Sequence, residues 1–112
     1  MEKVAVDETQ ILSPKLLHRR YGSLALHEHW CPGCEGMHQI AVDQPFSNGA
    51  RWTWDGIVDK PTFGPSVFLD PGGSHPCHYF IRAGRIDFCR DSYHALAGKS
   101  VDLPDIPTDW LD

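Results

Sequence analysis

The residues with the clearest capacity for chemistry are four cysteines. Cys31 and Cys34 enclose a Pro-Gly dipeptide, and a C-x2-C pair around such a turn is a typical half of a tetrahedral zinc site. The backbone amides of a tight turn point toward the thiolate sulfurs and stabilise their charge. Cys77 and Cys89 follow in the second half of the chain as further candidate ligands. The spacing therefore predicts one bound zinc ion per chain.

Three other uses of the cysteines stay open. Disulfides suit a secreted domain of this size, but residues 1–4 do not begin a charged and then apolar signal segment, so we expect a reducing compartment. A redox C-x2-C normally lies at a strand-to-helix junction, whereas the residues after Cys34 are typical of a turn and a strand. Unmodified buried thiols are the simplest alternative. Zinc is the preferred interpretation.

Composition restricts the class of protein. The chain has 112 residues, with ten Lys and Arg against fifteen Asp and Glu, for a formal net charge of -5. Such an acidic chain gains little from counterion release around phosphates, which argues against nucleic-acid binding. No apolar run reaches membrane-spanning length, so we expect a soluble protein with no membrane partner. The basic cluster of Lys15 and 18–20 is typical of a solvated face.

Glycine and proline predict the architecture. Ten Gly and nine Pro leave short windows with period-two patterns, which are typical of β structure. We expect one domain over 1–112 with a mainly β (small α+β) fold of compact, zinc-ribbon-like β-hairpins. Residues 1–14 are expected to form an arm or a partner-dependent strand, and 105–112 an acidic tail. Asp91 is expected to cap one short helix that runs to Leu96 near the C-terminus. The predicted strands are 22–30, 37–42, 51–54, 67–69, 77–82, 85–89 and 101–103.

The turn between strands 77–82 and 85–89 decides which side chains share a face. A three-residue turn over 82–84 requires a positive φ only at Gly84 and places Cys77 opposite Cys89, so that both thiols can share one ion. A two-residue turn requires a positive φ at Ala83, which costs energy, and places His78 opposite Cys89. The three-residue turn is the expected one, although the sequence leaves the choice open.

Four motifs in one order resemble those of a family of small proteins of tailed phages and prophages. The motifs are HWCPGC from His29, PTFGPS from Pro61, CHYF from Cys77 and DSYHALAG from Asp91, followed by VDLP. Members of that family are often labelled ammonia monooxygenase, yet nothing in this chain resembles a membrane copper enzyme. The resemblance therefore implies a phage context and no particular activity.

The resemblance also implies a ligand set. It covers Cys31, Cys34, Cys77, His78, Asp91 and His94. Similar proteins carry an aliphatic residue where Cys89 stands and a cysteine where Ser92 stands. This pattern implies His94 as the fourth zinc ligand after the first three cysteines, with Cys89 as the alternative.

The other histidines have less specific assignments. His27 and His29 project to one side of a strand, which suits a metal pair or, more commonly, an exposed polar face. The polar face is the expected arrangement. His38 completes a C-x3-H spacing after Cys34, but its place at the start of a strand favours a supporting or surface role. His18 and His75 have no partner evident in the sequence.

Two classes of function remain. The preferred interpretation is a phage-type accessory module with structural zinc that binds another protein through the acidic tail and through Thr62, Phe63 and Ser66. Such a module would be a host-directed inhibitor or a virion or morphogenesis accessory, located in the bacterial cytoplasm or the virion. The alternative is a small zinc-dependent hydrolase or deaminase-like enzyme that uses Asp91 or Glu35 as base and His78 or His94 to orient substrate. A thiolate-rich, closed zinc site and the absence of the deaminase motif order favour the first.

Overall fold

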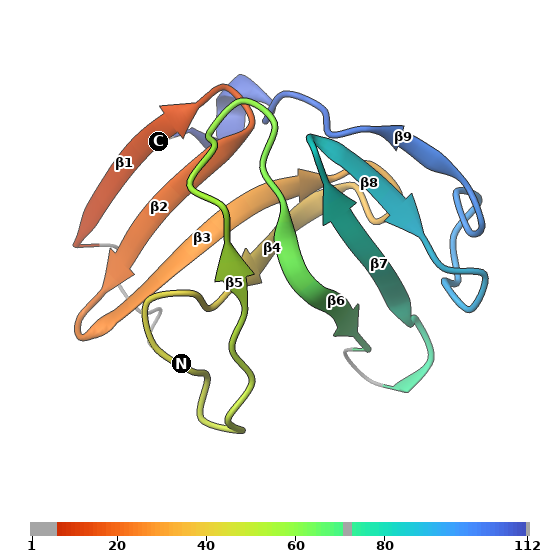
Figure 1. Ribbon diagram of the computed structural model, residues 1–112, viewed down its shortest axis with the longest axis horizontal. Helices are drawn as coiled ribbons and strands as arrows, with labels where there is room; N and C mark the ends of the chain where they lie inside the picture. Colours follow the sequence, from red (N-terminus) through yellow and green to blue (C-terminus); the bar gives the residue numbers. More distant parts are fainter. Residues whose placement is uncertain (1–6, 71–72, 112) are drawn as a thin grey trace.

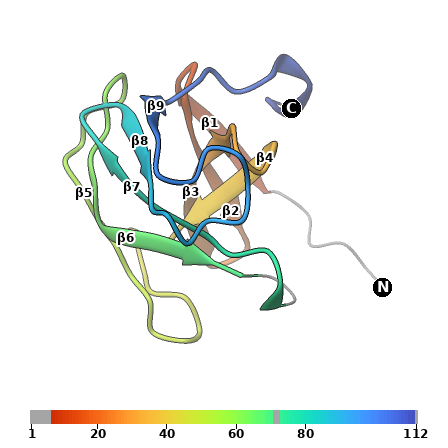
Figure 2. The same ribbon diagram turned by 90° about the vertical axis from the view of Figure 1, so that its right-hand side faces the viewer.

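The computed structural model describes residues 7–70 and 73–111, which form two antiparallel β-sheets that face each other (Figure 1, Figure 2). The first sheet consists of β1 (Glu8–Ser13), β2 (Leu16–Tyr21), β3 (Leu24–Cys31) and β4 (Gly36–Ile40). The second consists of β5 (Thr53–Trp54), β6 (Phe63–Leu69), β7 (Cys77–Arg82), β8 (Arg85–Phe88) and β9 (Ser100–Asp102). In both sheets the spatial order of the strands follows the chain. The predicted mainly β fold is confirmed.

Alternate side chains of both sheets fill the space between them, because successive residues of a strand point to opposite faces. The core cluster contains Leu16, Cys31, Ile40, Phe63, Val67, Cys77, Tyr79, Ile81, Ile86 and Phe88. Two of the four cysteines therefore lie in the apolar interior, at the C-terminal end of β3 and the N-terminal end of β7. The described residues form no apolar helix of membrane-spanning length.

The first described residues form an edge strand of the first sheet, and the last described residues pack on that sheet. Residues 8–13 of the expected arm make up β1, which pairs with β2, whereas residues 1–6 lie outside the described residues. Arg19 of β2 donates to Glu28 of β3 over 3.1 Å and to the carbonyl oxygen of Trp110 over 2.8 Å. Arg19 is only 8% exposed, so the prediction of a solvated basic face is wrong for this residue. Residues 105–111 of the expected tail cover this face of the sheet, and Ile106 is buried; residue 112 lies outside the described residues.

The predicted helix from Asp91 to Leu96 is absent, and turns at 90–91 and 95–98 flank a bend at 93–94. The amide of Ser92 donates to the carbonyl of Cys89, and that of Tyr93 to the carbonyl of Pro76. This second bond comes from another segment and takes the amide away from helical pairing. A 3-10 turn occurs later, at Thr108–Trp110.

The preferred hairpin register is also wrong. Arg82 pairs with Arg85, so the turn consists of two residues, Ala83 and Gly84. Their φ values are 51° and 76°. The amide of Ala83 donates to Thr62 Oγ1 over 2.8 Å, and that of Gly84 to a carbonyl of the same neighbouring segment over 3.0 Å. These tertiary bonds offset the cost of the left-handed Ala83. As a result, His78 lies beside Cys89, whose amide donates to the His78 carbonyl over 2.8 Å.

Candidate active site and metal cluster

Ser66 lies at an irregularity of the second sheet. The pairing of β6 with β7 shifts between Phe63 and Val67: these two residues are four positions apart on β6, but their partners are only two positions apart on β7. Such bulges redirect side chains and are common beside active sites. The indole Nε1 of Trp52 donates to the carbonyl oxygen of Ser66 over 3.1 Å. This bond holds the backbone of the serine in place.

The imidazole of His78, on the neighbouring strand β7, lies next to this serine. Its Nε2 is 3.1 Å from Ser66 Oγ, and its Nδ1 is 3.2 Å from both carboxylate oxygens of Asp91. In the tautomer with a proton on Nδ1, the ring donates to the carboxylate and Nε2 accepts from the serine hydroxyl. A hydroxyl, an imidazole and a carboxylate are thus connected in series.

Ser92 fixes the backbone of the histidine. Its Oγ donates to the His78 carbonyl over 3.0 Å and accepts from the His78 amide over 3.1 Å. The hydroxyl is buried, with Ser92 only 7% exposed. The turn that carries Ser92 also carries Asp91, so one segment positions both the imidazole and its carboxylate partner.

The imidazole and the carboxylate are accessible from solvent, and Ser66 is half-buried. The side chain of His78 is 28% exposed and that of Asp91 is 58% exposed. Phe68 lies two residues after Ser66 on β6, is 54% exposed, and has its ring centroid 5.5 Å from that of His78. Phe68 also lines a pocket of about 650 Å³ with Met37, Phe46, Leu69 and Tyr93. Cys34, His38 and Cys77 line the same pocket, whereas Ser66, His78 and Asp91 do not, so Phe68 is the residue that connects the pocket with His78.

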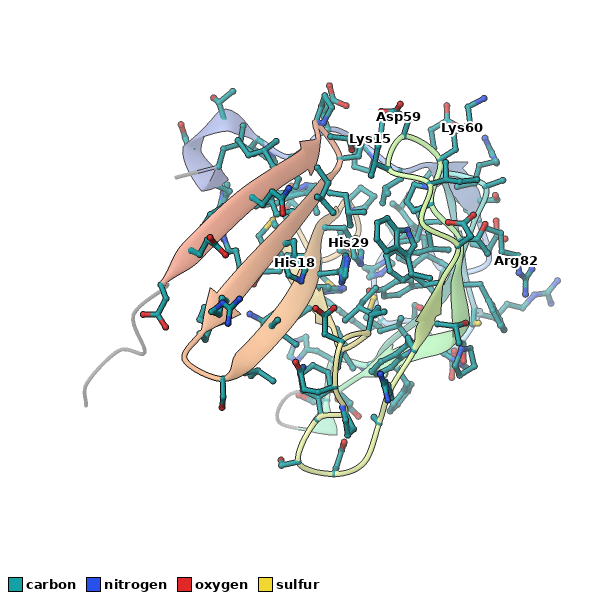
Figure 3. All side chains as sticks on the ribbon, turned by 60° about the vertical axis from the view of Figure 1, so that its left-hand side comes forward. Lys15, His18, His29, Asp59, Lys60 and Arg82 are labelled. Carbon is teal, nitrogen blue, oxygen red and sulfur yellow. The ribbon has the colours of Figure 1, made fainter. Side chains whose placement is uncertain are left out.

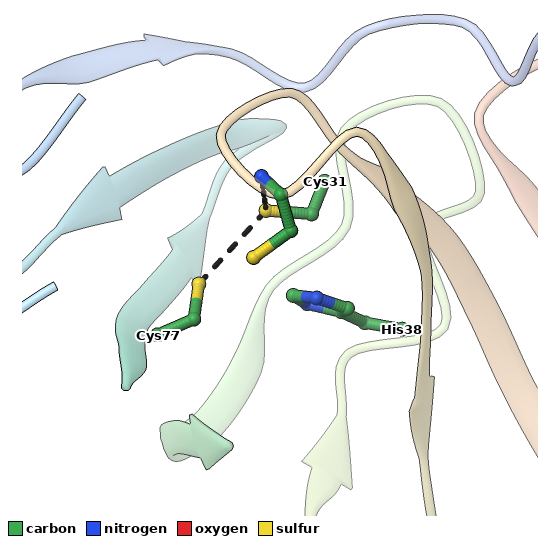
Figure 4. Close-up of side chains that lie close together, drawn as sticks. Cys31, His38 and Cys77 are labelled. Atoms are coloured by element: carbon green, nitrogen blue, oxygen red, sulfur yellow. Dashed lines mark hydrogen bonds between the residues drawn. The ribbon is translucent and has the colours of Figure 1, made fainter. Parts of the chain in front are cut away.

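Three cysteines and a histidine meet on the inner side of the same region. Figure 4 shows Cys31, Cys77 and His38 around a common centre. Their ligand atoms and that of Cys34 all lie within 4.8 Å of one another. The sulfurs of Cys31 and Cys77 are 3.9 Å apart, and the amide of Cys34 donates to Cys31 Sγ over 3.4 Å. Hydrogen bonds from Cys77 and from these turn amides lower the pKa of Cys31 to about 7 despite its burial. This cluster is able to hold a metal ion, as the spacing of the cysteines predicted.

A network of hydrogen bonds fixes the ring of His38. Its Nδ1 is 2.9 Å from the hydroxyl of Tyr79, which is in turn 2.7 Å from Nε2 of His29. This network leaves Nε2 of His38 as the nitrogen available to a metal. Burial lowers the pKa of His38 to about 4, with a further contribution from the charge of His94, so the ring is neutral, as a metal ligand must be.

The two candidate fourth ligands proposed from sequence have different surroundings. Nε2 of His94 is 3.4 Å from Cys77 Sγ, and its ring lies against Gly33, where an added Cβ would come within 2.2 Å of Cε1. Cys89 lies with His78 and Asp91 instead, on the outer face of the hairpin. This placement follows from the two-residue turn, which separates Cys89 from Cys77.

The remaining predicted site residues have structural roles. Thr62 accepts the amide of Ala83, and Phe63 is 2% exposed within the core. His27 and His29 are 4% and 0% exposed, so the prediction of an exposed polar face is wrong. They face the second sheet, and the described part of that sheet covers them.

A serine hydroxyl, a histidine and an aspartate in hydrogen-bonded series define the class of serine hydrolases, which is recognised by geometry and not by sequence position. The family model for BubE, described as the bacterial ubiquitination-like system serine protease, matches residues 4–89. The chain belongs to the BubE family. The match includes Ser66 and His78 and ends two residues before Asp91. No curated protein and no solved structure matches the chain.

This family assignment overturns two predictions. The resemblance to a phage and prophage family is wrong, because the BubE model spans the region of the first three motifs. Those motifs contain the three cysteines of the cluster and the hydrogen-bonded pair Ser66 and His78, and short motifs of this kind do not identify one family. The interpretation as a phage-type accessory module without chemistry of its own is wrong on the same finding. His78 and Asp91 came from the enzyme alternative, whereas Ser66 was predicted only as part of a binding loop.

Proposed function

We propose that this chain is a serine protease that hydrolyses a peptide bond in a protein of a bacterial ubiquitination-like system. The single observation that carries the proposal is the series from Ser66 Oγ through His78 to Asp91, with heavy-atom distances of 3.1 and 3.2 Å. These distances are within the range for a nucleophile and its base. The description of the BubE family supports the same activity.

Each of the three residues has one task in this reaction. As Ser66 Oγ attacks the carbonyl carbon, Nε2 of His78 takes the hydroxyl proton and then gives it to the leaving amine. The acyl group remains on Ser66 until water, deprotonated by the same nitrogen, attacks it. The bond to Ser66 Oγ then breaks, Nε2 returns the proton to that oxygen, and the acid is released. Asp91 holds the Nδ1 proton throughout and stabilises the imidazolium that forms in each half-reaction.

The pocket beside Phe68 supports a polypeptide substrate with an apolar side chain near the cleaved bond. Apolar and aromatic side chains make up much of the pocket lining, and Phe68, one of them, also packs against His78. A peptide that runs along the outer face of β6 would place one side chain in this pocket and an adjacent carbonyl near Ser66. Binding of such a side chain excludes water and strengthens the hydrogen bonds of the site.

The proposal predicts that a phosphonofluoridate probe labels one residue per chain, Ser66, because among the described residues its hydroxyl is the one bonded to an imidazole that is itself bonded to a carboxylate. Asp91→Asn should slow labelling by about 10²- to 10³-fold, less than the roughly 10⁴-fold of a buried aspartate, because solvent screens the exposed carboxylate. Mass spectrometry of proteolytic peptides identifies the labelled residue. Asp105→Asn, an exposed position of the tail, is the control and should label like the parent. Labelling at another serine, or at an unchanged rate in Asp91→Asn, would refute the assignment.

We also propose that the cysteine cluster binds zinc with a structural role and that His38 is the fourth ligand. Support comes from the hydrogen bond of its Nδ1 to Tyr79, since metal-ligating histidines usually bind a partner through the other ring nitrogen. Four protein ligands close a zinc site, whereas catalytic zinc keeps a position for water. The sequence-based candidate His94 contacts only Cys77 among the sulfurs by hydrogen bonding.

The two histidines can be distinguished by substitution. We expect His38→Ala to weaken zinc affinity by about 10²-fold or more, because a ligand is lost, and His94→Ala to weaken it by about 10-fold or less. Competition with a zinc-binding dye measures both affinities. A larger loss for His94→Ala would instead assign His94 as the fourth ligand, and a matching loss for Cys89→Ala would restore the four-cysteine alternative.

A further inference from the structure

A second group of metal-ligating side chains lies between the sheets, apart from the cysteine cluster. It consists of His18 on β2, His27 on β3 and Asp43 in the loop after β4. His18 and His27 are direct partners across the β2–β3 ladder, and their ring centroids are 4.8 Å apart. Figure 3 shows His18 on the side of the first sheet that faces the second. Two strands and one loop thus bring these three side chains together.

The distances within this group suit a shared ion. Asp43 Oδ2 is 3.0 Å from His18 Nε2, Asp43 Oδ1 is 3.7 Å from His27 Nδ1, and all ligand atoms lie within 4.8 Å of one another. An ion with bonds of about 2.1 Å separates its ligand atoms by about 3.0 Å at a right angle and about 3.4 Å at a tetrahedral angle. Small side-chain rotations would bring the three atoms onto one ion.

The strongest evidence is the ring nitrogen of His27 that lacks a partner. Nδ1 of this residue is buried and has no hydrogen bond, and its side chain is only 5% exposed. A buried polar atom without a partner costs about 1–3 kcal/mol, and one in a native fold calls for an explanation such as an ion. This nitrogen points toward the carboxylate of Asp43, from beyond hydrogen-bond distance.

The surroundings make the site apolar on one side and open on the other. The ring of His27 packs on Trp54 and Phe63 of the second sheet, with centroid distances of 4.7 and 6.1 Å. Burial lowers the pKa of His27, as does the neighbouring His18, while Asp43 raises it, so the imidazole stays neutral and keeps a lone pair. The side chains of His18 and Asp43 are 25% and 39% exposed, which gives an ion access from solvent.

We propose that His18, His27 and Asp43 bind a divalent transition-metal ion through two imidazole nitrogens and one carboxylate oxygen, with water at the remaining positions. Two histidines and one carboxylate with open positions are a recurrent ligand set for iron, zinc, cobalt and nickel. The ion joins the β4–β5 loop to the first sheet. That loop leads to Trp52, whose indole holds the carbonyl of Ser66.

Calorimetric titration with Co²⁺ of protein that holds one equivalent of zinc, bound at the cysteine cluster, tests this proposal. We expect one further equivalent to bind with micromolar or tighter affinity and to produce ligand-field bands without a thiolate charge-transfer band. Asp43→Asn and His18→Ala should each weaken this binding by about tenfold or more. Both residues are partly exposed, so their substitution should leave the fold intact, which a melting curve checks. Asp59→Asn, an exposed residue before β6, is the matched control and should bind like the parent.

The outcome is decisive in either direction. Absence of a further equivalent, or one whose affinity is the same in the parent and in both site variants, overturns the proposal. A thiolate charge-transfer band for that equivalent also overturns it, because it places the ion on cysteine. Ser66→Ala should abolish hydrolysis without changing metal binding at this second site. Failure of the proposed protease function and failure of the proposed metal site can therefore be distinguished.

Discussion

Ser66→Ala should reduce hydrolysis of protein substrates from the same ubiquitination-like system by about 10⁴-fold or more in kcat/KM. The substitution removes the only oxygen within hydrogen-bond distance of His78 Nε2 among the described residues. Without it the imidazole has no hydroxyl to deprotonate, and no acyl intermediate forms. Steady-state rates with the purified protein and variant measure the effect.

The fold should not change in this variant. Ser66 lies on the outer face of β6, and small substitutions at such positions shift stability by about 0.5 kcal/mol or less. Ser100→Ala, on an exposed part of β9, is the matched control and should keep full activity. Retention of a tenth of the parent rate in folded Ser66→Ala would show that another residue is the nucleophile.

Cys77→Ser should release the metal and lower the melting temperature by about 15 °C or more. Structural zinc binding contributes about 10–16 kcal/mol to the folding of small metal domains, and each kcal/mol corresponds to about 4–8 °C in a domain of this size. Cys77 also lies in the core at 1% exposure, so its loss affects both sheets. Elemental analysis gives the metal content and calorimetry gives the melting temperature.

Cys89→Ser supplies a control on the same hairpin. Its thiol lies on the outer face with His78 and Asp91, and burial together with the nearby Asp91 charge raises its pKa. This variant should keep one metal per chain and melt within about 3 °C of the parent. Equal metal loss in the two variants would contradict the assignment of ligands made from the structure.

Much of the sheet structure could be predicted from local pattern. Strands near β3, β4, β7, β8 and β9 follow from period-two alternation and from turns with glycine or proline. The strand β2 was missed because Arg19 and its neighbours are typical of a solvated face. Its burial depends on Glu28 and on the carbonyl of Trp110, which lies 91 residues later in the chain. Local pattern contains no information on such a contact.

The hairpin register shows why the site was only partly predicted. The energetic argument against a positive φ at Ala83 is sound locally, but Thr62 and the loop before β6 supply the hydrogen bonds that make this turn favourable. The wrong register put both Cys77 and Cys89 on one face. The observed register separates them and leaves His78 on the outer face with Asp91.

The nucleophile was the least predictable catalytic residue. Ser66 has no glycine-flanked motif of the kind that marks a nucleophile elbow, and it depends on a bulge opposite β7. Ser66 and His78 are twelve residues apart in the sequence, and they become neighbours only because β6 and β7 pair. A signal was present in the residue types, since Ser66, His78 and Asp91 were all singled out, but for separate roles.

The alternation of Cys77 and His78 along β7 has a consequence for how this enzyme would be classified by inhibitors. One residue points inward to the metal cluster and the next points outward to Ser66. On the proposed function, a strong chelator would inactivate the protein by loosening the strand that holds the proposed base, although the proposed reaction does not use the metal. Organophosphorus reagents would inactivate it as well. An inhibitor profile alone would therefore indicate both a metalloprotease and a serine protease. The two would be distinguished by whether unfolding accompanies the loss of activity, as expected with a chelator, or does not, as expected with an organophosphorus reagent.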